Sequence, residues 1–190
     1  MADRRGVRGH AQAWIELNAE DPEARSALEV ARAHLAAGKP LQGLRRLRVF
    51  ELSGRLPAAE PLAELLHRST QFYNPHKERC TVRTASEDPP PLANDEHVVL
   101  VWERGGERRP AAERWWQHET KRKIEVREGT AWVLRFERGE RPAERAVELA
   151  ELKDRRHGLL CNPHSQEYRL GHGGAPLPWW PATPARKEPT

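Results

Sequence analysis

The sequence has no long hydrophobic segment and very little cysteine, and both absences limit what the protein can be. Nowhere in its 190 residues do 18 apolar residues follow one another, which excludes a membrane-spanning helix. The opening segment MADRRGVRGHAQAW is charged and lacks the apolar stretch of a secretory signal. Cys80 and Cys161 are the only cysteines, and without an export signal they are expected to stay reduced. These features predict a cytoplasmic protein.

An excess of charge of one sign is also missing, because 32 Lys and Arg residues are balanced by 28 Asp and Glu residues. The basic runs at 45–48, 121–123 and 154–157 are short and interrupted, whereas a nucleic-acid interface needs clustered Lys and Arg. RNA-recognition modules carry a basic-Gly-aromatic motif on a central strand, and the segment TAWVLRF lacks both its glycine and its basic start. RNA binding is therefore placed third among the functions considered, with weak, salt-sensitive affinity expected.

The first 70 residues favour helix. In the segment DPEARSALEVARAHLAAGKPLQGLRRLRVFELSG, Asp21 is a suitable N-cap and Pro22 suits the first helical turn. Gly38 ends this predicted helix, and a second helix is predicted after Pro40. The apolar residues at helical spacing are Ala24, Ala27, Leu28, Ala31 and Leu35 in the first helix, and Leu41, Leu44, Leu47 and Phe50 in the second.

This predicted hairpin resembles a single tetratricopeptide-type unit. The resemblance rests on the pattern ARAHLAAGKPLQGLRRL followed by ELSGRLP and covers about 35 residues. A third helix is predicted at 61–67, where the leucines fall at helical spacing. One repeat-like unit cannot bury its apolar face alone. We therefore expect residues 1–70 to pack on the rest of the chain or on a partner.

Two irregular segments flank the remaining regular structure. Residues 71–84 are aromatic and β-branched and are predicted to add one strand, and residues 85–95 form an acidic, Pro-rich linker. Residues 171–190 are rich in Gly and Pro and should lack regular structure. Trp179 and Trp180 are the exception in this tail. Such an aromatic pair is expected to dock onto a surface of this chain or of a partner.

Residues 96–170 show strand and helix patterns in alternation. EHVVLVWER fits a buried strand, a helix is predicted from Pro110, and KIEVREGTAWVLRFE alternates as two strands with Glu128-Gly129 as the turn. A second helix is predicted from Pro142, and SQEYRL forms the last strand. This βαββαβ order predicts a ferredoxin-like domain with an antiparallel sheet. The expected fold class is α+β, with a helical N-terminal part followed by this domain.

The end of this domain resembles a known family. AERAVELAELKDRRHGLLCNPHSQEYRL is similar to the closing helix, the LL-x-N-P corner and the last strand of PurS, the small subunit of formylglycinamide ribonucleotide amidotransferase. The resemblance covers 96–170 loosely and 143–170 better. It implies a compact βαββαβ subunit that associates with itself and bridges larger catalytic partners, without a complete active site of its own.

The tripeptide Asn-Pro-His occurs twice, at 74–76 and at 162–164, each time after a predicted helix and before a predicted strand. Proline moves the residue before it into an extended or turn conformation, and an asparagine side chain can bond to its own backbone there. Asn74-Pro75 and Asn162-Pro163 are therefore interpreted as matching structural corners. This interpretation does not account for the histidine that both copies share.

A zinc site is the alternative interpretation of these segments. The spacings are His-x3-Cys in the first and Cys-x2-His in the second, and two thiolates with two imidazoles suit tetrahedral zinc. The four candidate ligands are His76, Cys80, Cys161 and His164. Spacing of this kind often occurs without a metal, so the corner interpretation is preferred and no cofactor is expected.

No set of residues in the sequence points to a catalytic mechanism. Both cysteines have histidines nearby in the sequence, but the two members of a catalytic Cys-His pair normally come from distant segments. The sequence has no Gly-x-Ser-x-Gly elbow and no glycine-rich phosphate loop that leads into a helix. We therefore expect a non-enzymatic subunit that self-associates or bridges partner proteins. A PurS-like accessory subunit of a purine-biosynthetic amidotransferase is the alternative.

Overall fold

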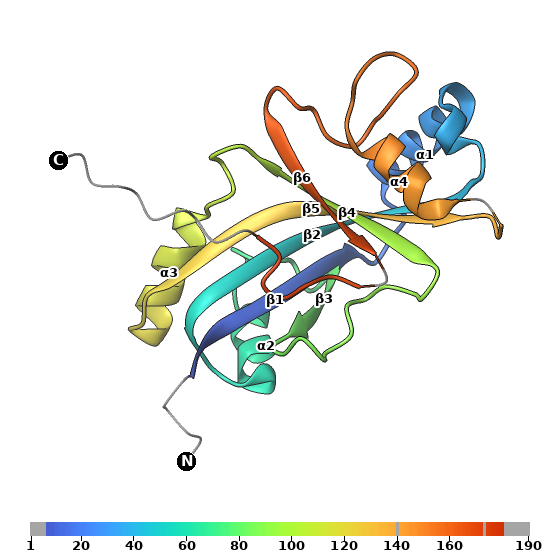
Figure 1. Ribbon diagram of the computed structural model, residues 1–190. Helices are drawn as coiled ribbons and strands as arrows, with labels where there is room; N and C mark the ends of the chain where they lie inside the picture. The colour runs from blue at the N-terminus through green and yellow to red at the C-terminus, as the bar shows by residue number, and fades with distance from the viewer. Residues whose placement is uncertain (1–6, 140, 173, 181–190) are drawn as a thin grey trace.

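Six strands form one antiparallel sheet in the order β3-β1-β2-β5-β4-β6 (Figure 1). The computed structural model describes residues 7–139, 141–172 and 174–180. No helix among them is both long and apolar enough to cross a membrane. The elements are β1 (Val7–Leu17), α1 (Pro22–His34), the short 3-10 helix η1 (Ala36–Gly38), β2 (Leu41–Leu56), α2 (Ala59–His67), β3 (Glu78–Arg83), β4 (Glu96–Glu103), α3 (Pro110–Thr120), β5 (Ile124–Phe136), α4 (Pro142–Ala150) and β6 (Gln166–His172).

The prediction of a helical N-terminal part is wrong. The described residues begin with the strand β1, and the segment predicted as the second helix is β2, which lies in the middle of the sheet. Both faces of β2 are covered, so apolar residues occur at odd and even positions alike. Leu44 and Phe50 face one side and Leu47 the other, which creates a spacing of three residues that imitates a helical face. The tetratricopeptide-like hairpin is therefore absent.

The ferredoxin-like prediction for residues 96–170 is also wrong. β5 is one continuous strand, and the predicted turn residues Glu128 and Gly129 lie inside it, paired with Phe50 and Val49 of β2. A Cβ on Gly129 would lie 2.9 Å from the Trp180 ring. Gly129 is therefore found where the Trp180 side chain packs closely against the strand, and not in a turn. The second half is consequently βαβαβ and not βαββαβ.

The coarser fold class and the cap of α1 are confirmed by the structure. The fold is α+β with an antiparallel sheet. Asp21 caps α1, where its Oδ1 accepts hydrogen bonds from the backbone N–H groups of Glu23 (2.9 Å) and Ala24 (3.3 Å). Within 71–84 the chain forms β3, and residues 85–95 contain no helix or strand.

The described residues form two halves with the same order of strands and α-helices, and the short η1 occurs in the first half. The first half runs β1-α1-β2-α2-β3 and the second runs β4-α3-β5-α4-β6. From the edge to the centre of the sheet, the first half runs β3-β1-β2 and the second half runs β6-β4-β5. Equivalent strands therefore occupy equivalent places, and β2 and β5 meet at the centre. Figure 1 shows α1 beside α4 at one end of the strands, and α2 and α3 towards the other end. Each end thus receives one helix from each half.

All four helices cover the same face of the sheet. Two apolar clusters lie beneath them, one at the α1/α4 end and one at the α2/α3 end. The opposite face, called the helix-free face below, carries a third cluster that is covered by the segment 175–180. This third cluster contains Trp14, Leu47, Val49, Val98, Leu100, Trp102, Ala131, Val133, Ala175, Trp179 and Trp180.

Candidate interaction site: two matched corners and the helix-free face

The first Asn-Pro-His segment is a tight corner between α2 and β3. The Asn74 side-chain oxygen accepts a hydrogen bond from the backbone N–H of His76 at 3.0 Å. The Asn74 carbonyl accepts from the N–H groups of Lys77 (3.0 Å) and Glu78 (2.8 Å). The Asn74 N–H donates to the Glu78 carboxylate at 2.7 Å. One asparagine therefore closes the whole turn.

The second segment, between α4 and β6, repeats this pattern atom for atom. The Asn162 side-chain oxygen accepts from the N–H of His164 at 3.0 Å, and its carbonyl accepts from the N–H groups of Ser165 (3.2 Å) and Gln166 (2.8 Å). The Asn162 N–H donates to the Gln166 side chain at 2.9 Å. The two segments are thus equivalent corners, each closed by an acceptor side chain four residues after the asparagine.

Each corner is also tied to a neighbouring strand end in the same way. The N–H of Asn18, just after β1, donates to the Lys77 carbonyl at 2.9 Å, and the N–H of Arg104, just after β4, donates to the Ser165 carbonyl at 2.9 Å. The sheet order places the two corners beside opposite edge strands. Five strand spacings of about 4.8 Å separate these edges by about 24 Å.

This separation keeps the four predicted zinc ligands apart. Cys80 lies on β3 and Cys161 lies ahead of β6, each with the histidine of its own corner. Burial raises the pKa of Cys80 to about 12 and also raises the pKa of Cys161, and a neutral thiol is a poor metal ligand. Within the described ranges, no group of three or more His, Cys, Asp or Glu residues is arranged to hold a metal ion.

The side chains of both corner histidines are exposed. The turn uses only the backbone N–H of His76 and of His164, so any residue except proline would serve there. Turn chemistry accounts for the asparagines, but it gives no reason for a histidine at the same place in both halves.

Trp179 and Trp180, predicted to dock onto a surface, are buried against the helix-free face of their own chain. Trp179 is 0% exposed and Trp180 is 3% exposed. The Trp179 ring lies 5.6 Å from that of Trp14 on β1, and the Trp180 ring lies 5.8 Å from that of Trp102 on β4. The two tryptophans therefore contact one strand of each half.

Buried polar side chains of the sheet hold this tail segment in place. The Glu51 carboxylate accepts a hydrogen bond from the backbone N–H of Trp179 at 2.6 Å. Gln12 donates to the Pro176 carbonyl at 2.7 Å, and Arg83 donates to the Ala175 carbonyl at 2.9 Å. Burial raises the pKa of Glu51 despite these hydrogen bonds. Sequence reasoning missed this group, because its residues were assigned to a helical region or left without a role.

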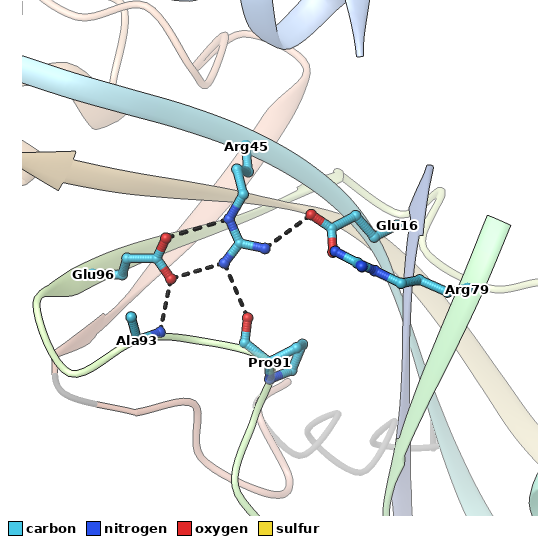
Figure 2. Close-up of polar contacts among 6 residues, drawn as sticks. All are labelled: Glu16, Arg45, Arg79, Pro91, Ala93 and Glu96. Atoms are coloured by element: carbon cyan, nitrogen blue, oxygen red, sulfur yellow. Dashed lines mark hydrogen bonds and ion pairs between the residues drawn. The ribbon is translucent and has the colours of Figure 1, made fainter. Parts of the chain in front are cut away.

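Arg45 joins the linker to the sheet (Figure 2). Its guanidinium contacts Glu16 at 2.9 Å and Glu96 at 2.8 Å, and it donates to the Pro91 carbonyl at 3.0 Å. Glu16 also contacts Arg79 of β3 at 2.6 Å. Burial raises the pKa of Glu16, but hydrogen bonds from the two arginines outweigh this effect and the pKa falls below its usual value. Arg45, which belongs to the basic run 45–48 of the sequence, therefore ties the linker to the sheet. Arg45 with Glu16, Glu96 and Pro91 is called the Arg45 clasp below.

Among the grooves on the helical side of the sheet are two that lie between helices. One, of about 310 Å³, lies between the two helix pairs, and its arginines are neutralised by carboxylates, as in the Arg48–Glu78 pair at 2.9 Å. The other, of about 620 Å³, lies between α2 and α3, where Arg68 pairs with Glu119 at 2.9 Å above the buried Trp116. Both grooves carry charges of both signs. They are therefore better suited to bind a neutral or zwitterionic ligand surface than a polyanion.

Comparison of the chain with known protein families, curated proteins and solved structures finds no match.

Proposed function

We propose that this protein is a non-enzymatic assembly subunit that bridges partner proteins. The observation that carries the proposal is the repetition of one surface, an edge strand with its Asn-Pro-His corner, at both edges of a single sheet. A surface that occurs twice on one chain suits a protein whose task is to hold two copies of a partner at a fixed separation.

The chemistry of this surface is consistent with protein recognition. Edge strands present unpaired backbone groups that can accept a further strand. Beside β3 the corner exposes His76, with Arg79 having 67% of its side chain exposed. Beside β6 it exposes His164, with Arg104 having 58% of its side chain exposed. Each arginine already pairs with a carboxylate, Arg79 with Glu16 at 2.6 Å and Arg104 with Glu167 at 3.3 Å. A partner segment with an acidic side chain beside an extended strand would share these arginines at both places.

A PurS-like accessory subunit of a purine-biosynthetic amidotransferase is the second candidate. The resemblance rests on a closing helix, an Asn-Pro corner and a last strand, and these correspond to α4, the second corner and β6. The same arrangement recurs in the first half as α2, the first corner and β3. The first half repeats the order of elements without the LL-x-N-P sequence, and the second half is βαβαβ where the resemblance implies βαββαβ. This candidate therefore rests on residues 143–170 alone.

A binding assay with the purified large catalytic subunit of formylglycinamide ribonucleotide amidotransferase tests the second candidate and, through variants of the corners, the proposed binding surface. We expect His76→Asp and His164→Asp each to remove one of two binding events, and the double variant to remove both, because an introduced carboxylate repels an acidic partner. Asn94→Asp, at an exposed linker position, is the matched control and should bind like the original chain. No binding of this subunit would reject the PurS-like role, whereas binding that ignores both histidine changes would reject the corner surface.

Self-association through the same edges remains a proposal alongside bridging. Light scattering at micromolar concentration distinguishes the two, because edge-to-edge pairing gives a mass above that of one chain. A clean monomer that still binds two partner copies would leave bridging alone.

A further inference from the structure

The two halves are arranged like two subunits related by a twofold axis, each using the same surface to contact the other. β2 and β5 run antiparallel at the centre, with register from Leu41–Phe136 to Gly54–Ile124. A half-turn about an axis through this pair exchanges β1 with β4 and β3 with β6. Two identical subunits related by a twofold axis form an interface with this self-complementary geometry.

Each helix-covered cluster is built from both halves. The cluster at the α1/α4 end joins Ala31 and Leu44 of the first half with Val99 and Ala146 of the second. The cluster at the other end joins Ile15 and Phe72 with Trp116 and Val126. Within the described residues, neither half closes a helix-covered core from its own side chains, so each half supplies what the other lacks.

The covalent connection between the halves lies outside these two clusters. The linker 85–95 is held by the Arg45 clasp at one end, and Arg83 donates to the Asp88 carbonyl at 2.6 Å at the other. Only Leu92 of the linker packs on an apolar cluster, the one on the helix-free face. Breaking the chain here would therefore leave both helix-covered clusters intact.

We propose that the surface along β2 and β5 is the pairing surface of a two-chain assembly, and that the partner it fits is a second copy of the same βαβαβ unit. The linker holds two such units in one chain. This inference does not depend on what the edge strands bind, so it stands or falls separately from the bridging function.

The test begins with the intact, folded protein. A specific protease site inserted between Asn94 and Asp95, both exposed, allows the linker to be cut after folding. Fragments 1–94 and 95–190 should stay together in one species with the elution volume of the uncut chain. The unfolding midpoint of the cut protein should fall on dilution, since unfolding then separates two chains. The same site between Gly105 and Gly106, inside the second unit, is the matched control.

Exchange between cut complexes then identifies the partner. When tagged and untagged proteins cut at 94/95 are mixed, fragments should exchange faster than in the control, whose fragment 1–105 keeps β4 between β5 and β6 of the other fragment. Tagged 95–190 should also retain untagged 95–190, which reveals the unit paired with its own copy. Separation of the fragments on cleavage, exchange no faster than in the control, or the absence of paired 95–190 would each overturn the proposal.

Discussion

The asparagine of each corner makes the hydrogen bonds that close it, and its neighbouring histidine makes only one through the backbone. Asn162→Ala removes the side-chain acceptor for the N–H of His164, so the free energy of unfolding should fall by about 1 kcal/mol. His164→Gln keeps the backbone N–H and changes only an exposed side chain. It should therefore lower the free energy of unfolding much less than Asn162→Ala does. Urea denaturation of the two variants compares these changes.

A zinc site would give the opposite order. Loss of His164 would then remove a ligand and most of the stability that ligation supplies, and a chelator would reproduce the loss in the unmodified protein. A glutamine variant that is less stable than the alanine variant of Asn162 would therefore contradict the corner account.

At the scale of the element, the tail segment 175–180 is coupled to a buried carboxylate on β2. Burial raises the pKa of Glu51 in the folded protein, so the folded state favours its protonated form relative to the unfolded state. The stabilising effect of this group is complete below the unfolded pKa and is lost as the pH rises through the folded pKa. The contribution of Glu51 to the free energy of unfolding is therefore smaller at neutral pH than in acid.

Glu51→Gln should remove this pH dependence, because a neutral amide oxygen can still accept the hydrogen bond from the Trp179 N–H. We expect the unfolding free energy of the variant to rise relative to that of the original chain as the pH increases from 4 to 7, as measured by denaturant titration. Glu125→Gln, at a partly exposed position on the neighbouring strand, is the control. An equal pH dependence in the original chain and the Glu51 variant would contradict the assignment.

Local signals in the sequence were sufficient for the four helices and for β3, β4 and β6, but not for β1, β2 and β5. α1 was found because Asp21 and Pro22 give a capping pattern that does not depend on the rest of the fold. β2 was missed because both of its faces are buried, and its leucines no longer alternate. Gly129 was read as a turn because nothing local reveals that Trp180, 51 positions later in the chain, packs against it.

The candidate site was found only in part for the same reason. The corners could be read from Asn-Pro and the turn chemistry that it imposes. The clasp around Arg45 and the buried Gln12–Arg83 pair join segments that are far apart in sequence, and single-sequence patterns carry no record of such contacts. The repeated Asn-Pro-His tripeptide pointed to two equivalent halves. The predicted order of helices and strands differed between the halves, however, so the equivalence did not emerge from the sequence.

At the scale of the whole molecule, the two halves place one surface at each edge of a common sheet. Because β2 and β5 are joined across the centre, the separation between these surfaces is fixed by the sheet and not by a flexible linker. A partner bound at one edge is therefore held at a constant distance from a partner bound at the other. This rigidity suits an assembly subunit better than a tether.

The most direct test of this account is the mass of the complex that a tagged chain retains from cells, measured by native mass spectrometry. The account predicts one chain with two copies of the same partner, and one copy when either His76 or His164 is replaced by Asp. A complex with a single partner copy that both variants retain unchanged would contradict the claim that the protein bridges partners through its two corners.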